Sequence, residues 1–167
     1  MTYARTSVTQ YLGDLSKKTP APGGGSVAAL CLACAAGLVA MVCEYTIGKE
    51  TCKAFSSRAR CLLKRSLKIR DEAVRLVDAD IRAYLKKDRA QSIAVPARIC
   101  RLSAETARMA REVAQKGNKN LRSDADLAAS LAKAAVSGSR SYVRVNIRSL
   151  KNSRKYAKLL KELKTIG

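Results

Sequence analysis

Histidine and tryptophan are absent from the 167-residue chain, and phenylalanine occurs once. Without histidine the chain lacks the commonest metal ligand and the commonest general base. Any acid–base chemistry must therefore use Asp, Glu, Lys, Tyr or Cys. Aromatic residues make up only 4% of the chain, whereas alanine and aliphatic residues are abundant, and small apolar side chains suit close helix–helix packing better than a β-sandwich. The composition predicts an all-α fold, and the length suits a single domain over residues 1–167.

Acidic residues are also scarce, with 13 Asp and Glu against 33 Lys and Arg and a formal net charge of +20. A field of this sign attracts polyanions such as nucleic acid, anionic lipid or a polyanionic small molecule. The last thirty residues hold nine Lys or Arg, of which four recur at helical spacing: Arg140, Arg144, Arg148 and Lys151. This stripe is either a binding surface for phosphates or carboxylates or a solvated face. Nucleic-acid binding is possible but not favoured, because few aromatic side chains are present for stacking.

The six cysteines lack the partners that metal and redox sites use. Cys31 and Cys34 form a C-x-x-C, but no second pair and no histidine accompany it. We therefore predict no metal site and interpret these cysteines as small buried hydrophobes. The polar, amphipathic start MTYARTSVTQYLGDL does not have the pattern of a signal peptide. We expect a reducing, cytoplasmic setting.

Residues 19–43 carry no charge and join the loop TPAPGGGS to an apolar run. The loop leaves only 26–43 for a helix, rich in Ala, Cys and Gly rather than Leu, Ile and Phe, which favours a buried core helix over a membrane span. Glycines at a helix start let backbone N–H groups approach an anionic ligand closely. The loop is therefore either a flexible helix entry or part of an anion-binding pocket. It is not a P-loop, because the lysine and the spacing of that motif are missing.

Helical periodicity covers nearly all of the chain. We predict helices over 6–16, from about Ser26 to Ile47, over Thr51–Lys87, over 97–116, from about Ser123 to Leu150, and over 152–164. Pro96 predicts a kink or a short break within 88–96. Ser123 with Asp126 three residues on resembles a capping box. Together these elements describe a multihelical bundle with long helices around a central apolar helix.

The motif VDADIRAYLKK holds a second candidate site. Asp78 and Asp80 differ by about 200° around a helix, so they must have separate roles. Asp78 faces Arg82 at i+4, which predicts a surface ion pair. Asp80 shares a face with Tyr84 and Lys87, and this stripe is either a proton-handling set or a solvated face.

Taken together, these segments resemble the cyclodeaminase/cyclohydrolase family of folate enzymes. That family includes the formimidoyltetrahydrofolate cyclodeaminase domain and a bacterial methenyltetrahydrofolate cyclohydrolase. The resemblance rests on six stretches in order over most of the chain: TPAPGGGSVAAL, TIGKE, DADIRAY, VP, GNKNLRSDADLAASLAKAA and VRVNIRSL. It implies a homodimer with the pocket near the subunit interface, a tetrahydrofolate derivative as substrate, no required cofactor and no membrane association.

The resemblance also implies which residues form the site. The catalytic residues would be Asp80, Tyr84 and Lys49. The substrate-binding residues would be Pro22, Gly23, Gly24, Gly25, Ser26, Asn118, Ser123, Asp124, Arg144 and Asn146. In this family, water opens the methenyl ring to a 10-formyl product, or a ring nitrogen displaces ammonia from a formimino carbon, and an aspartate suits the proton transfer in either reaction. A glycine-rich helix start with Lys and Arg nearby suits the glutamate carboxylates of folates.

The chain departs from the family pattern at three places. The segment between Tyr84 and AVPAR is shorter by about twenty residues than we expect. Asp126 stands where we expect a glycine, and Tyr142 where we expect an asparagine. The fold expectation is unchanged. Two alternatives to a folate one-carbon enzyme stay open: a catalytically impaired family member that binds folate or another polyanion, and a basic nucleic-acid-binding helical protein.

Overall fold

A computed structural model describes residues 2–150 and 153–166. These residues form six α-helices and four short 3₁₀ helices, in the order η1 (Tyr3–Arg5), α1 (Val8–Leu15), α2 (Gly24–Glu44), η2 (Glu50–Phe55), α3 (Ser56–Leu85), α4 (Gln91–Lys116), η3 (Lys119–Leu121), α5 (Arg122–Arg148), η4 (Arg154–Tyr156) and α6 (Ala157–Thr165). The described residues contain no strand. The predicted all-α fold is confirmed.

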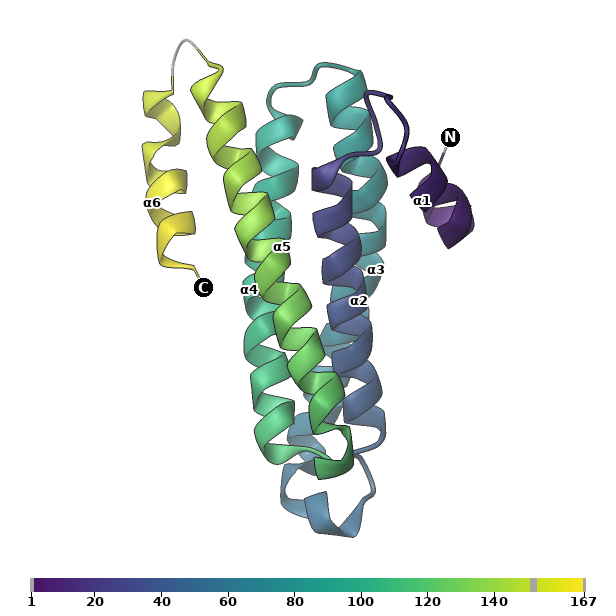
Figure 1. The fold of residues 1–167 in the computed structure, drawn as a ribbon. Coiled ribbons are helices and arrows are strands. Elements are labelled where there is room, and N and C mark those ends of the chain that lie inside the picture. The colour runs from purple at the N-terminus through teal and green to yellow at the C-terminus, as the bar shows by residue number, and fades with distance from the viewer. Residues whose placement is uncertain (1, 151–152, 167) are drawn as a thin grey trace.

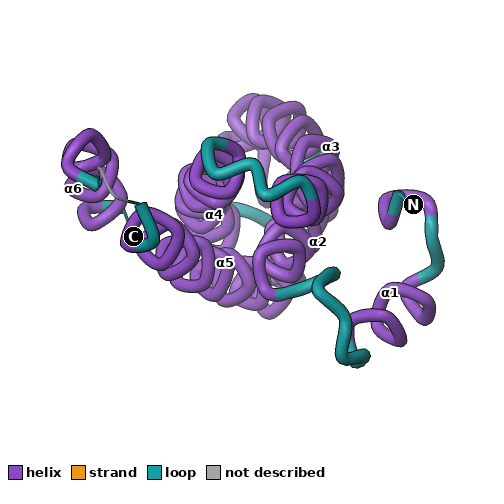
Figure 2. The backbone as a smooth tube through the Cα atoms, turned by 90° about the horizontal axis from the view of Figure 1, so that it is seen from above, coloured by secondary structure: helices purple, strands orange, loops and turns teal. Residues whose placement is uncertain are grey.

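The long helices α2, α3, α4 and α5 form an elongated bundle, with α6 outside it on one side and α1 standing off on the other (Figures 1 and 2). α2 packs against α3, α4 and α5, and six of its eleven buried residues are alanines, whose short side chains allow close approach. By length and composition α2 could cross a membrane, but 61% of that segment is buried inside the bundle. Its place in the core explains its apolar character and confirms the predicted central helix.

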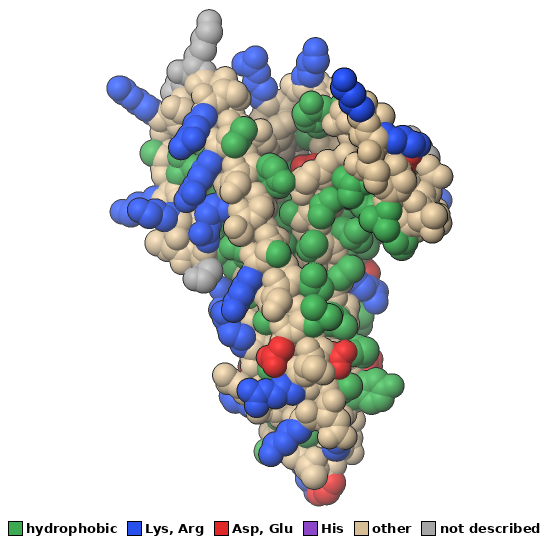
Figure 3. Space-filling view, in the orientation of Figure 1, with side chains coloured by type: hydrophobic (Ala, Val, Ile, Leu, Met, Phe, Trp, Pro, Cys, Tyr) green, Lys and Arg blue, Asp and Glu red, His purple; other side chains and the backbone are tan. Residues whose placement is uncertain are grey.

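The surface of the bundle is divided by residue type (Figure 3). Hydrophobic side chains form a band over α2, and Lys and Arg gather along α5 and α6.

Cys34 and Cys61 are exposed and Cys31 is half-buried, whereas the other three cysteines are buried. The interpretation of the C-x-x-C pair as buried is therefore wrong for Cys34, which lies on the outward face of α2. All six cysteines are free thiols.

The predicted surface ion pair between Asp78 and Arg82 is wrong. Asp78 is buried and accepts hydrogen bonds from the backbone N–H groups of Tyr3 at 2.7 Å and Ala4 at 3.4 Å. Both N–H groups belong to η1 and have no partner within that short helix, so a carboxylate is a suitable acceptor for them. Asp78 thereby ties the N-terminal segment to α3.

α3 and α4 are joined by a tight turn. The N–H of Asp88 donates to the Ala83 carbonyl at 2.9 Å and that of Lys87 to the Tyr84 carbonyl at 3.0 Å, which are the two hydrogen bonds of a Schellman motif. Lys87 has φ +52°, the left-handed conformation that this motif requires. Asp88 Oδ1 also accepts from the N–H of Gln91, so one residue ends the turn and begins α4.

The predicted short break within 88–96 is confirmed at residues 88–90, which lie in the turn between α3 and α4, whereas the helix is not interrupted at Pro96, which lies inside α4. Proline cannot donate to the carbonyl four residues earlier, which here is that of Ser92. The side-chain amide of Asn146 on α5 takes its place, with Nδ2 donating to the Ser92 carbonyl at 2.6 Å. A neighbouring helix thus supplies the hydrogen bond that Pro96 removes.

The predicted capping box at Ser123 is also wrong. α5 begins at Arg122, its N-cap residue is Leu121, and no side chain caps it. Asn118 instead accepts a hydrogen bond from the N–H of Asn120 and caps η3. The short helix η3 therefore leads directly into α5, and Ser123 lies in the first turn of α5 rather than before it.

Candidate active site

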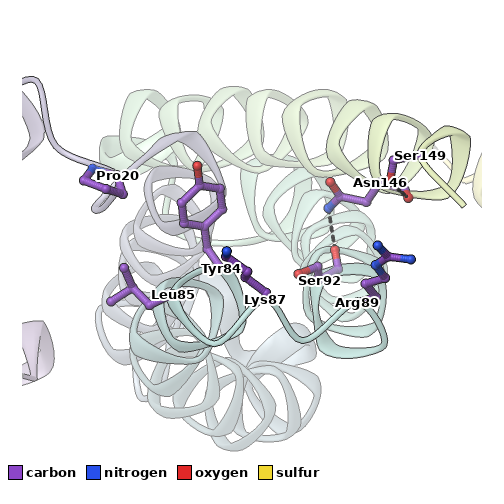
Figure 4. A pocket seen from close by; sticks show the side chains of 8 residues that line it. All are labelled: Pro20, Tyr84, Leu85, Lys87, Arg89, Ser92, Asn146 and Ser149. Carbon is purple, nitrogen blue, oxygen red and sulfur yellow. Dashed lines mark hydrogen bonds between the residues drawn. The ribbon is translucent and has the colours of Figure 1, made fainter.

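A cavity of about 250 Å³ lies at the end of the bundle where α2 begins. The loop before α2 and its first turn form one wall, and side chains of α3, α4 and α5 form the others: Asp80, Tyr84, Ser92, Tyr142 and Asn146. A larger hollow of about 530 Å³ adjoins it and shares Tyr84, Ser92 and Asn146 (Figure 4). The two hollows make one pocket with a narrow inner part and a wide outer part.

Asp80 forms the acidic end of the inner pocket. A Cβ atom at Gly25 would lie 2.5 Å from Cγ and from Oδ2 of Asp80, so only glycine lets this carboxyl rest against the first turn of α2. Burial raises the pKa of Asp80 to about 6, and a hydrogen bond from the backbone N–H of Ser26 partly offsets the effect. A carboxyl with this pKa exchanges a proton readily near neutral pH.

Tyr142 approaches the same helix turn from α5. A Cβ atom at Gly24 would lie 2.7 Å from Cζ of Tyr142 and closer still to its hydroxyl oxygen. The lack of a side chain at Gly24 therefore leaves room for the Tyr142 phenol from α5, and the lack of one at Gly25 leaves room for the Asp80 carboxyl from α3. Tyr142 was not among the site residues expected from the sequence. It lies four residues before Asn146, which puts both on one face of α5, and this spacing could have indicated its place in the site.

The outer part of the pocket is lined by polar and basic side chains from the α3–α4 turn. Tyr84 is 60% exposed and lies between Pro20 and Asn146 in Figure 4. Lys87 and Arg89 stand along the same rim. Because the turn is short, no further segment from it covers Tyr84. The pocket is therefore open on the side that faces solvent.

Six of the residues expected to bind substrate do not line the pocket of one chain: Pro22, Ser26 and Arg144, and three residues at the other end of the bundle. Pro22 is buried behind the loop. The Ser26 hydroxyl is buried and donates to the Gly23 carbonyl at 2.7 Å, while lying 2.9 Å from the hydroxyl of Tyr11. Arg144 lies on another face of α5 and lines a groove beside α6. Within one chain the side chains of Pro22, Ser26 and Arg144 lie outside the pocket, which the backbone N–H of Ser26 reaches. Their role in substrate binding stays a prediction.

Lys49 and three of the expected site residues form a separate cluster at the opposite end of the bundle. Lys49 Nζ donates to Asn118 Oδ1 at 2.7 Å, and the N–H of Asn118 donates to the Thr46 hydroxyl at 3.0 Å. Ser123 and Asp124 follow in the first turn of α5. α2 spans 21 residues between the two ends, a length of about 30 Å. Within one chain the expected catalytic residues Lys49 and Asp80 are not brought together.

The fold and the pocket define a class: an all-α bundle that holds a half-buried carboxyl against a glycine-rich helix start. The family model described as formiminotransferase-cyclodeaminase matches residues 7–90 and 85–165. The chain is 31% identical over 180 residues to the methenyltetrahydrofolate cyclohydrolase of Methylorubrum extorquens, with 94% of this chain and 86% of that protein covered. The chain belongs to the formiminotransferase-cyclodeaminase family, which confirms the resemblance seen in its sequence.

Two further relatives extend the comparison. The chain is 27% identical over 189 residues to formimidoyltransferase-cyclodeaminase of Rattus norvegicus and spans 35% of that protein. The crystal structure of formiminotetrahydrofolate cyclodeaminase from Thermotoga maritima superposes with a TM-score of 0.78 at 25% identity, covering 96% of this chain and 89% of that one. The bundle thus corresponds to nearly a whole chain in one relative and to about a third of another.

The contact at Gly25 predicts a sharp difference between two helical glycines. Gly25→Ala would place a methyl group against the Asp80 carboxyl, and we expect it to destabilise the protein by about 1–3 kcal/mol. Gly13→Ala, in the exposed helix α1, meets nothing within 4 Å and is expected to stabilise by about 1 kcal/mol. Urea unfolding of the two variants measures the difference. Equal stabilisation by both alanines would show that Asp80 does not rest on Gly25.

Proposed function

We propose that this protein is a folate one-carbon enzyme, and specifically a methenyltetrahydrofolate cyclohydrolase. The observation that carries the proposal is the half-buried Asp80 carboxyl, held against Gly25 at the start of α2 with its pKa raised to about 6. The cyclohydrolase relative supports the choice of reaction, because the match covers most of both chains.

The cyclohydrolase reaction adds one water to a cationic carbon that is bonded to two nitrogens. Asp80 accepts a proton from the water as its oxygen attacks that carbon. The same proton then passes to the ring nitrogen as its bond to the carbon breaks. The hydroxyl proton leaves to solvent as the C=O of the formyl group forms on the other nitrogen, so the cation and water give a neutral product and one proton. No electrons are gained or lost, and the reaction as written needs no cofactor. A group of pKa about 6 suits both proton transfers near neutral pH.

The rest of the pocket suits the other parts of a folate. Backbone N–H groups at the start of α2 can donate to the heteroatoms of a pterin ring. Tyr84 offers an aromatic face at the mouth, and Asn146 lies beside it. Lys87 and Arg89 on the outer rim carry the charge that glutamate carboxylates require.

Asp80→Asn tests this assignment. The amide cannot accept the proton, so we expect the decay of the methenyltetrahydrofolate absorbance to fall by a factor of about 100 or more relative to the parent. In the parent, kcat/KM should rise with pH through about 6, because Asp80 acts only after it loses its proton. Stopped-flow absorbance with the uncatalysed rate subtracted gives both results. A variant as active as the parent would remove Asp80 from the mechanism.

Formimidoyltetrahydrofolate cyclodeaminase activity is the second candidate. It is favoured by the structural match to the Thermotoga maritima cyclodeaminase, which covers nearly all of both chains. In that reaction the proton held by Asp80 would pass to the departing ammonia rather than to a ring nitrogen. Ammonia release from the formimino substrate distinguishes the two reactions with the same purified protein.

We further propose that the protein is a homodimer that pairs through α2. Six side chains on the outward face of this helix recur at spacings of four and three residues: Val27, Cys31, Cys34, Leu38, Met41 and Tyr45. We call them the α2 stripe. Each is half-buried or exposed in the single chain, and Figure 3 shows hydrophobic side chains gathered over α2. A continuous apolar stripe of this length is typical of a helix that packs against a partner.

A two-fold axis perpendicular to the α2 stripe would also complete the site. Two α2 helices related in this way run antiparallel, and the interface repeats itself on both subunits. The cluster of Lys49 and Asn118 at the end of one α2 then comes close to the start of α2 in the partner, where Asp80 lies. This arrangement gives a reason for finding the expected catalytic residues at opposite ends of one chain.

Mixing two inactive variants tests the shared site. We expect Asp80→Asn and Lys49→Ala each to be inactive alone. Co-refolded in equal amounts, they should recover about a quarter of the parent activity, because half of the dimers are mixed and each mixed dimer keeps one intact site. Asp80→Asn mixed with Asp80→Ala is the control, and it should recover none. Absence of recovery in the first mixture, with mixed dimers shown by mass spectrometry, would contradict a shared site.

A further inference from the structure

A second concave site lies between α4, α5 and α6, away from the candidate active site. We call it the α4–α6 groove. It has a volume of about 510 Å³, which lies within the range of small-ligand sites. Its floor is formed by small or β-branched side chains, Ala104, Ala107 and Val136, which are all buried. Short side chains on two packed helices leave this hollow open.

The walls of the groove carry five cations from three helices: Arg108, Arg111, Lys133, Arg140 and Lys164. No acidic residue lines it. Within residues 2–150 and 153–166, none of the five forms an ion pair. Like charges around one hollow repel each other, and a bound anion would relieve that repulsion.

The nearby carboxylates are engaged elsewhere. Glu105 of α4 pairs with Arg65 at 2.6 Å and Glu112 pairs with Arg58 at 2.8 Å, both on α3. Glu162 of α6 pairs with Arg101 at 2.6 Å. The acids that could neutralise the groove are thus held in other pairs, and its positive charge is available to a ligand.

We propose that the α4–α6 groove binds a compact polyphosphate. Guanidinium groups donate two parallel hydrogen bonds to phosphate, which suits Arg108 and Arg111 on neighbouring turns of α4. Lys133 and Lys164 add charge from the facing helices, and the hydroxyls of Ser137 and Thr165 add neutral donors. Five positive charges around one hollow match a ligand with several adjacent phosphates better than a single phosphate.

The arrangement of the cations favours a compact ligand over a nucleic acid. A nucleic-acid backbone is contacted by cations spread along a line, whereas these five come from three helices and converge on one hollow. Arg140 also donates from Nη2 to the Ile166 carbonyl, which holds the end of α6 against the groove as a wall. A second groove beside α6 is lined by Arg144, Arg148 and Arg154. A linear polyanion would need both grooves, whereas a compact ligand needs only the α4–α6 groove.

Calorimetric titration of the full-length protein with inorganic tripolyphosphate, at physiological salt, tests the proposal. We expect saturable binding of one ligand per chain and a higher melting temperature with ligand. Replacing Arg108 and Arg111 together with Gln should weaken binding about tenfold or more, because two charge-assisted contacts are lost. Replacing Arg148 and Arg154 together with Gln in the second groove is the matched control, because it removes the same charge, and it should leave the affinity within about twofold. All four arginines are exposed, and none forms an ion pair among the described residues, so we expect the unliganded variants to melt like the parent.

Three results would overturn the proposal. Tripolyphosphate that does not saturate the parent protein would show that the groove is not a site. An equal loss of affinity in the two double variants would show attraction by the overall charge alone. Duplex DNA that displaces tripolyphosphate and depends on all four arginines would identify a nucleic-acid surface that spans both grooves.

Discussion

The contact between the first turn of α2 and two side chains from its neighbours sets the geometry of the pocket. Gly25 admits the Asp80 carboxyl and Gly24 admits the Tyr142 phenol, so α3 and α5 both approach α2 at its start. Burial of Asp80 by this contact raises its pKa to about 6, and the space left between the three helices is the inner pocket. Two of the three glycines, Gly24 and Gly25, are therefore explained by the side chains that lie against them.

The length of α2 imposes a second constraint. The helix places the Asp80 pocket at one end of the bundle and the hydrogen-bonded pair Lys49 and Asn118 at the other. No rearrangement within one compact bundle would bring them together, since α2 is buried along most of its length. Antiparallel pairing of two chains through the α2 stripe would bring Lys49 and Asn118 of one chain close to the Asp80 pocket of the other. It would also cover the hydrophobic band in Figure 3.

Sequence periodicity predicted the helices well, because an apolar face recurs along each of them. Sequence periodicity gave wrong predictions where one helix supplies a hydrogen-bond partner to another. Pro96 stays inside α4 because Asn146 on α5 replaces the lost donor, and Asp78 is buried because η1 folds onto it. The sequence pattern identified Asp80 and the glycine loop as candidate sites, and the resemblance to the family assigned their roles. The resemblance could not show that Arg144 turns away from the pocket and that Tyr142 turns into it, because these orientations depend on how α5 is rotated in this bundle.

The central claim is that Asp80 is held in a half-buried site against α2 and exchanges a proton near neutral pH. The most direct test is a ¹³C NMR titration of the side-chain carboxyl of Asp80, with Asp80→Asn used to assign its signal. The account predicts a midpoint near pH 6. A midpoint near 4, the ordinary value for an aspartate, would show that the carboxyl is solvated and would contradict the account.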